Sequence, residues 1–140
     1  VSDYVITEHD CRGTRRAEDS IGMGSYGMDS HNCSRFVKNG RVLNDGDVQV
    51  HGFPPYGISY RSIIPRGGEC QNLLVPVCLS ASHIAYGSAR MEPVFMVLGE
   101  SAAYAACMCV DNNYAVQQVP YARLREELLV AQQVLEVPDR

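Results

Sequence analysis

The sequence predicts an α+β fold: mainly antiparallel strands and hairpins in the first half, then a buried strand and two C-terminal helices. Three observations predict it. Turn residues separate short apolar runs over the first half, residues 73–79 form one continuous apolar run, and two helical patterns follow that run. Strands that precede helices along a chain, rather than alternating with them, are typical of the α+β class.

The first half contains the strand and hairpin signals. Five short segments are strand candidates: residues 3–7, 21–28, 36–42, 48–51 and 58–64. Asn39-Gly40 lies between short apolar pairs and predicts a two-residue hairpin turn. The three glycines of residues 21–28 suit a strand that another backbone approaches closely. Residues 8–19, which are charged and irregular, and residues 29–34 are predicted loops.

The second half begins with the apolar run. Residues 73–79 show little alternation, so they predict a strand buried on both faces. Residues 80–92 are small and polar and predict a loop. A helix of small residues is expected to start near Pro93, a residue favoured in the first helical turn, and to run to about Asp111.

The C-terminal part of the chain predicts one more strand and one more helix. Residues 116–119 are a short strand candidate, and Pro120 begins a helix through Val130. The apolar stripe of this helix consists of Leu124, Leu128 and Leu129. With 140 residues, 46% of them hydrophobic, the chain is long enough to build one domain with a core.

Composition limits the classes of partner. The net charge is −4, from 12 basic and 16 acidic residues, and neither sign is clustered, which argues against nucleic-acid binding. No stretch approaches eighteen apolar residues without a charge, so no membrane span is predicted. The six cysteines lack C-x-x-C spacing, so we predict no metal site and favour free thiols, with a bridge among Cys11, Cys33 and Cys70 left open.

Several motifs lie in a fixed order along the chain. Those of the second half are Asn72-Leu-Leu-Val75, Ser80-Ala-Ser-His83, Gly87-Ser88, Arg90-Met-Glu-Pro93 and Leu98-Gly99. Those of the first half are Asp19-Ser-Ile21, Gly24-Ser-Tyr26, Asp29-Ser-His31 and Tyr60-Arg-Ser-Ile-Ile-Pro65. In this order the chain, from about residue 4 to residue 135, resembles the C-terminal portion of the FAD-dependent oxidoreductases.

The resemblance implies that the whole protein binds FAD and transfers a hydride between an organic substrate and the flavin. Residues 1–70 would be substrate-domain-like strands, and residues 71–140 would be the strand, loop and helices that cap the flavin. Some relatives are labelled putative xanthan lyase and occur in bacteria that degrade polysaccharides, so a sugar-derived substrate is one hypothesis. Ala103 stands where the family usually has Gly, at a position of close packing.

A dinucleotide-binding motif is missing from the chain. Flavoproteins of this type begin with a strand, a Gly-x-Gly-x-x-Gly turn and a helix. The closest match, at Gly22, Gly24 and Gly27, lies in a strand pattern without a following helix. Together with Val1 in place of Met, this predicts a fragment whose partner is a missing N-terminal dinucleotide-binding domain. Alone, the fragment is expected neither to retain FAD nor to be active.

The segment before the long helix is the candidate flavin site. A helix N-terminus carries partial positive charge, which favours the electron density that the pyrimidine side of a flavin gains on reduction. The candidate cofactor-binding residues are Ser80, Ser82, Ser88, Ala89, Arg90, Met91 and Glu92. For Glu92 the alternative is a first-turn carboxylate that only favours the helix dipole.

The candidate catalytic residues are His83, His31 and Arg61. His83 would be a polar group near the flavin ring, or a loop histidine bound to a local carbonyl. Asp29 and His31 are two residues apart, so in an extended chain both face the same side and could form an acid–base pair. Arg61 could grip a substrate carboxylate or a flavin phosphate, or form an ion pair with an acidic residue.

Two other classes of function remain open at this point. One is a binding or interaction module without flavin, in which exposed apolar surface drives dimerisation. The other is a polysaccharide-associated protein such as a carbohydrate lyase. The sequence contains no Gly-x-Ser-x-Gly elbow and no nucleophile–base constellation, which makes a hydrolase a weak hypothesis.

Overall fold

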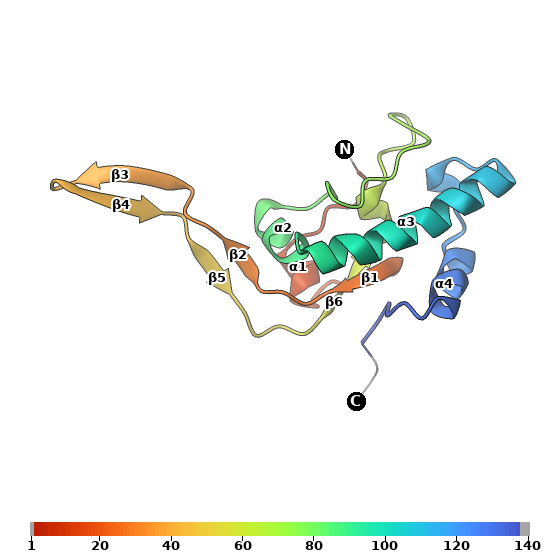
Figure 1. The fold of residues 1–140 in the computed structure, drawn as a ribbon, viewed down its shortest axis with the longest axis horizontal. Coiled ribbons are helices and arrows are strands. Elements are labelled where there is room, and N and C mark those ends of the chain that lie inside the picture. Colours follow the sequence, from red (N-terminus) through yellow and green to blue (C-terminus); the bar gives the residue numbers. More distant parts are fainter. Residues whose placement is uncertain (1, 138–140) are drawn as a thin grey trace.

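The first half of the chain folds into three nested antiparallel strand pairs. The computed structural model describes residues 2–137. β1 (Ser20–Gly24) pairs with β6 (Tyr56–Ser59), β2 (Met28–Ser30) with β5 (Val48–Val50), and β3 (Ser34–Lys38) with β4 (Arg41–Asp45). The chain therefore runs outward through one set of strands and returns through the other. Figure 1 shows that the two outer pairs form a long two-stranded arm that extends away from the body.

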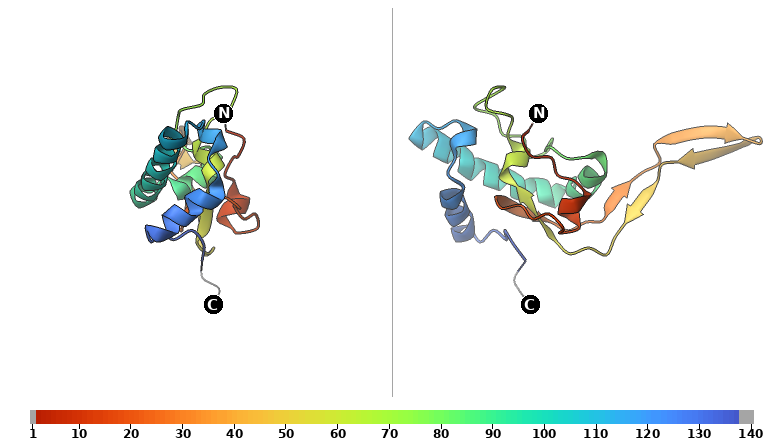
Figure 2. Two further views of the ribbon diagram at one scale, coloured as in Figure 1. Left: turned by 90° about the vertical axis from the view of Figure 1, so that its right-hand side faces the viewer. Right: turned by 180° about the vertical axis from the view of Figure 1, so that it is seen from behind.

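Helices make up most of the second half: α2 (His83–Ala89), α3 (Glu92–Asn112), the 3-10 helix η2 (Val116–Gln118) and α4 (Tyr121–Val130). Two short helices of the first half, α1 (Glu8–Cys11) and the 3-10 helix η1 (Tyr60–Ile63), complete the body. Seen from behind, α4 lies below the far end of α3, at the opposite end of the molecule from the arm (Figure 2). The predicted α+β class, with antiparallel strand pairs first and helices last, is confirmed.

The core lies where α3 crosses β1. Ser101 in α3 donates a hydrogen bond of 2.6 Å to the carbonyl oxygen of Ile21, and both residues are fully buried. A Cβ at Gly22 would lie 2.6 Å from a methyl carbon of Val97, so only glycine allows α3 to approach this closely. The prediction of one strand at residues 21–28 that another backbone approaches was therefore only partly right, because β1 ends at Gly24 and the group next to Gly22 is a side chain of α3.

Local sequence signals predicted several elements correctly. Asn39 and Gly40 both have positive φ, 53° and 72°, as a type I′ turn requires, and they join β3 to β4. The predicted helix near residues 93–111 is α3, and the predicted helix after Pro120 is α4. In α4, Leu124 and Leu128 are buried as predicted.

The prediction that the stripe of α4 includes Leu129 was wrong, because its side chain is 44% exposed on the solvent side of the helix. All six cysteines lie within the described residues and are free thiols. This agrees with the preference for free thiols over disulfides.

The predicted buried strand at residues 73–79 was wrong. The segment is extended without strand pairing, and Leu73 and Val77 are 45% and 48% exposed. Cys78, expected in that strand, is exposed as well. A strand buried on both faces needs neighbours on both sides. The backbone N–H of Val75 donates to the carbonyl oxygen of Ile63, and that of Ser80, just after the segment, donates to Ser62. Pro76 has no N–H to donate.

Other boundaries also differ from prediction. Residues 83–89 of the predicted loop form α2, whose first turn is capped by Ser82 accepting from the Ala85 N–H. Residues 8–11 of the first predicted loop form α1. The strand predicted at 116–119 is η2, and the strand predicted at 58–64 turns into η1 after Ser59. The strand predicted at 3–7 is reduced to one parallel bridge, between Ile6 and Ala81.

α3 is long and apolar enough, by length and composition, to cross a membrane. A single such helix is weak evidence, because core helices of soluble proteins pass the same test. About a third of its most apolar window is buried within the described structure. The expectation that no segment spans a membrane therefore stays a prediction.

Candidate functional site

The candidate site lies at the junction of α2 and α3. α2 ends at Ala89, Arg90 is its C-cap, and Met91 is already the N-cap of α3. α3 has 21 residues, so its aligned peptide dipoles give a partial positive charge at this end. Glu92, in the first turn, is exposed and complements that charge. Arg90 therefore lies beside the positive end of a long helix.

A close backbone approach joins this junction to the base of the arm. A Cβ at Gly87 would overlap the carbonyl oxygen of Asp29, so α2 can rest on β2 only because residue 87 is glycine. One consequence is the position of Arg90, whose Nη2 lies 3.8 Å from Asp29 Oδ2. The Gly87-Ser88 motif thus sets the distance between two segments about 60 residues apart in sequence.

Asp29 is the centre of a small polar group, which we call the Asp29 cluster: Asp29, His31, Gln49 and Arg90. Asp29 is buried, and its Oδ1 accepts a hydrogen bond of 2.6 Å from Gln49 Nε2. His31 Nε2 lies 3.9 Å from Asp29 Oδ2, and the His31 side chain is 79% exposed. This separation is longer than a hydrogen bond, so the exposed imidazole is near the buried carboxylate without being held by it.

Arg90 has capacity to bind one more group. Its Nε is buried and has no hydrogen-bond partner among residues 2–137. A buried donor without an acceptor is unfavourable by roughly 1–3 kcal/mol, but a molecule bound from solvent cannot reach an enclosed atom. The Arg90 side chain as a whole is 35% exposed, so its outer guanidinium nitrogens can contact an acceptor on a bound molecule. A flavin ring offers such acceptors on its pyrimidine side.

Ser88 and Ala89, also predicted to contact a cofactor, are fully buried. The hydroxyl of Ser88 accepts a hydrogen bond of 2.8 Å from Tyr56 and donates one to the carbonyl oxygen of Tyr26. The side chains of both residues therefore position α2 from inside the body.

Ser80, Ser82 and His83 lie at the opposite end of α2 from Arg90. Ser80 is tied through its backbone to Ile6, with an N···O distance of 2.9 Å, and Ser82 caps the helix. His83 is exposed in the first turn. A helix of seven residues separates this end from Arg90 by about 10 Å. The structure thus brings His31 and Arg90 to Asp29, with Met91 and Glu92 directly after Arg90 in the chain, but leaves the Ser80–His83 motif apart.

Arg61 forms the ion pair that was the alternative to substrate binding. Its Nε donates a hydrogen bond of 3.0 Å to Asp19 Oδ2, and its guanidinium carbon lies 5.0 Å from the ring centre of Tyr4. Burial alone would raise the pKa of Asp19, but hydrogen bonds from Arg61 and Ser59 outweigh it and lower that pKa. Arg61 is therefore engaged within the fold.

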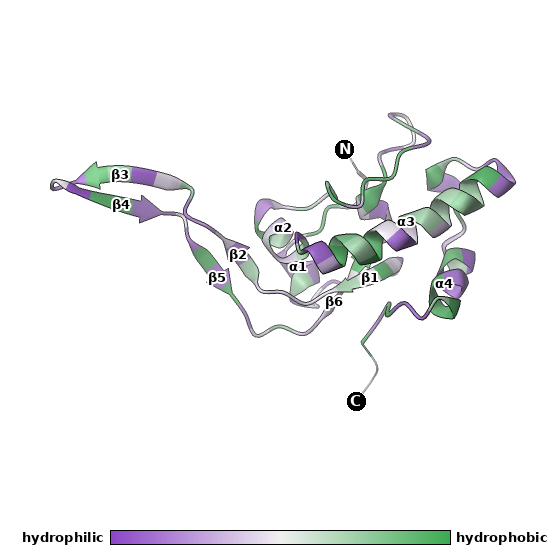
Figure 3. Cartoon of the chain, in the orientation of Figure 1, coloured by the Kyte–Doolittle hydropathy of each residue, from purple (hydrophilic) through white to green (hydrophobic). Residues whose placement is uncertain are grey.

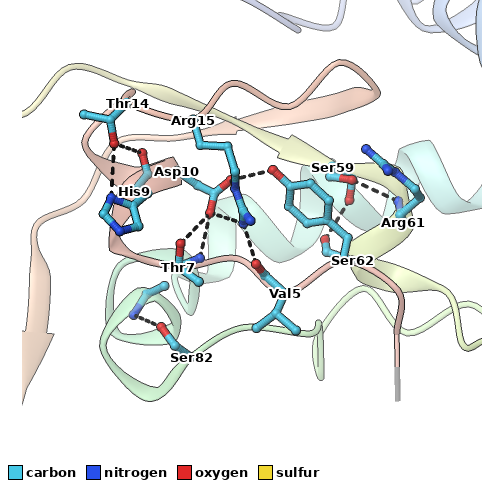
Figure 4. A network of polar contacts seen from close by, with 12 residues as sticks. Val5, Thr7, His9, Asp10, Thr14, Arg15, Ser59, Arg61, Ser62 and Ser82 are labelled. Atoms are coloured by element: carbon cyan, nitrogen blue, oxygen red, sulfur yellow. Dashed lines mark hydrogen bonds and ion pairs between the residues drawn. The ribbon is translucent and has the colours of Figure 1, made fainter.

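Asp10 is a further buried carboxylate, and it was not predicted from the sequence. Asp10, 2% exposed, accepts hydrogen bonds from Tyr4, Thr7 and Arg15 (Figure 4). Burial tends to raise its pKa, and these hydrogen bonds together lower it. Burial, followed by the hydrogen bond to Asp10, raises the pKa of Tyr4 to about 12. Thr7 and Asp10 have the spacing of a helix capping box, which was the available signal.

The glycine motif at residues 22–27 serves packing. Added Cβ atoms at Gly22, Gly24 and Gly27 would meet the side chains of Val97, Tyr56 and His51. The space next to these glycines is thus filled by the protein itself. Within residues 2–137, no group of three or more His, Cys, Asp or Glu side chains is placed to hold a metal ion.

Fold and site together define an α+β domain with a cluster of polar side chains near the N-terminus of a long helix. The family model for FAD dependent oxidoreductases matches residues 1–128. The chain therefore belongs to the FAD-dependent oxidoreductase family, as the motifs predict. Searches of curated proteins and of solved structures found no match to the chain.

Proposed function

We propose that this chain is the C-terminal part of an FAD-dependent oxidoreductase, in which the α2–α3 junction closes over the flavin and helps shape the substrate pocket. Membership of the family implies FAD and a dinucleotide-binding domain in full-length relatives. The observation that supports the proposal most is the partly exposed guanidinium of Arg90 at the N-terminal end of α3. It lies beside Asp29 and His31, which can serve a substrate.

In this proposal the chain contributes two sets of groups. Arg90, Met91 and Glu92 would face the flavin, and the motif from Ser80 to His83 would contact another part of it. Bound FAD supplies the hydride acceptor for an organic substrate. His31, near Asp29, would take the proton from a substrate hydroxyl. The polar cluster suits a substrate with several hydroxyl groups, so a sugar-derived substrate remains part of the proposal.

The outer face of α3 supports a missing partner domain. Met96, Ala103, Cys107 and Val110 share one exposed side of the helix, and Met96 and Val110 are 75% and 82% exposed. No described atom lies within 4 Å of a Cβ built at Gly99 on this side. Figure 3 shows apolar colour along α3 and along the exposed segment before α2. We propose that the dinucleotide-binding domain covers this face, with close packing at Ala103 against that domain.

The first test is flavin retention. We expect the purified 140-residue chain to be colourless, because its glycine motif is occupied by protein side chains and the proposed dinucleotide-binding domain is absent. Absorbance spectra in the visible range measure this directly. A yellow protein that keeps flavin through gel filtration would contradict the division of the site between two domains.

Light scattering on the same sample tests for dimerisation through the exposed face of α3.

The second test concerns Arg90 in a protein that contains both domains. We expect Arg90→Met to weaken flavin affinity at least about tenfold, because a charged hydrogen-bond donor is lost. Arg66→Met is the matched control, since Arg66 pairs with exposed Asp3 away from the junction. Affinity is measured by flavin fluorescence during titration of the apoprotein. Equal affinities for both variants would contradict a flavin contact at Arg90.

A further inference from the structure

The outer part of the arm exposes apolar side chains to solvent. We call β3, β4 and their turn the arm hairpin (residues 34–45). All ten of its strand residues are exposed. The view from behind shows the arm hairpin well away from the helices (Figure 2, right). An isolated two-stranded hairpin is at best marginally stable in water, so exposed apolar residues on it point to a partner.

The strand register defines which side chains share a face. Phe36 lies opposite Leu43, and their exposed fractions are 43% and 40%. On the same face, Lys38 and Arg41 lie towards the turn, and Ser34 and Asp45 lie towards the base of the arm. This face therefore has a basic end, an apolar centre and an acidic end.

The opposite face has a different character. Val37 and Val42 face each other there, and Arg35 Nε donates a hydrogen bond of 3.0 Å to Asn44 Oδ1. These four residues include a base and no acid. Of the two faces, only the one with Phe36 and Leu43 is complementary to itself.

We propose that a second copy of this chain docks on the Phe36–Leu43 face, with the two arm hairpins stacked face to face and antiparallel. A two-fold axis runs across the strands through Phe36 and Leu43. It places each residue of a strand over the residue of the same strand in the other copy that lies equally far from the centre on its other side. Phe36 then packs on Phe36 of the partner subunit, and Arg41 lies over Asp45 of the partner subunit. The pair of Arg41 with Asp45 forms twice.

Charge selects this antiparallel arrangement. If the two arm hairpins ran parallel, Lys38 and Arg41 would lie over the same residues of the other copy, and the four like charges would repel. The antiparallel arrangement also leaves the two bodies at opposite ends of the paired arms, because each arm extends away from its own body (Figure 1).

The size of the Phe36–Leu43 face determines how strongly two copies are expected to associate. Six strand residues per copy lie on this face, fewer than the roughly 20–30 residues per partner of a standard interface, so association should be weak and should depend on concentration. The contact uses no residue of the α2–α3 junction. A test of this dimer is therefore independent of a test of the proposed function.

Charge reversal tests the proposal. In the chain carrying Met96→Glu, which disfavours association through α3, we expect a concentration-dependent dimer by sedimentation equilibrium. R41D alone and D45R alone should each weaken this dimer at least about tenfold, since each homodimer places two pairs of like charges together. An equimolar mixture of R41D and D45R chains should dimerise again, because every pair in the mixed dimer has opposite charges. Circular dichroism of each variant confirms that the chain remains folded.

Every outcome is informative. Association of the mixture, but of neither variant alone, supports stacked antiparallel arms. A monomer at all concentrations overturns the proposal. So does a dimer that R41D and D45R leave unchanged, which would indicate pairing through strand edges or through another face.

Discussion

Replacing Gly87 by alanine is expected to lower the free energy of unfolding by roughly 2–3 kcal/mol. The added methyl group would overlap the carbonyl oxygen of Asp29, which is backbone and cannot rotate away. That backbone is fixed in turn, because Asp29 pairs with Gln49 between β2 and β5. α2 must therefore move off β2. The higher helix propensity of alanine, worth about 1 kcal/mol, offsets only part of the strain.

Gly99→Ala is the matched control, because it makes the same change inside a helix without the overlap. No described atom lies within 4 Å of a Cβ at residue 99. We expect this variant to be more stable than the original chain by up to about 1 kcal/mol. Urea denaturation followed by circular dichroism measures both variants. Equal stability of the two alanine variants would show that α2 does not rest on the backbone of β2.

Elements that were predicted correctly rest on signals within a few residues. Asn39-Gly40 fixes the hairpin because both residues adopt positive φ easily. The extent of α3 follows from a proline at its start and from Asn113, which ends it in the left-handed conformation. Such signals need no knowledge of the rest of the fold, so a single sequence is enough.

Sequence predictions failed where residues far apart along the chain determine the local structure. Residues 73–79 have the composition of a buried strand, and composition cannot say whether partner strands are present. For Arg61, the sequence left substrate, flavin phosphate and ion pair as alternatives, because its ion pair with Asp19 spans 42 positions and leaves no local pattern. The Asp29–His31 pair could be predicted from spacing, but its approach to Arg90 depends on the contact at Gly87.

Asp10→Asn is expected to lower the free energy of unfolding by roughly 2–3 kcal/mol at pH 7, because Arg15 loses the carboxylate that it binds. The effect should depend on pH. The pKa of Asp10 is lowered in the folded chain from an ordinary value of 3.8, so below that value the unfolded chain binds the proton first. The carboxylate therefore stabilises the fold fully above about pH 4 and loses its effect as pH falls through the folded pKa.

Urea denaturation of the original chain and of D10N, repeated at each pH from neutral to acid, measures this dependence. We expect the difference in stability between the two chains to shrink steadily below about pH 4. Glu126→Gln, at an exposed position of α4, is the control and should follow the original chain throughout. Asp19, whose pKa is also lowered, keeps some acid sensitivity in D10N. Stability curves of the two chains that stay parallel far below the ordinary pKa of an aspartate would show that Asp10 is not held as a carboxylate by Arg15.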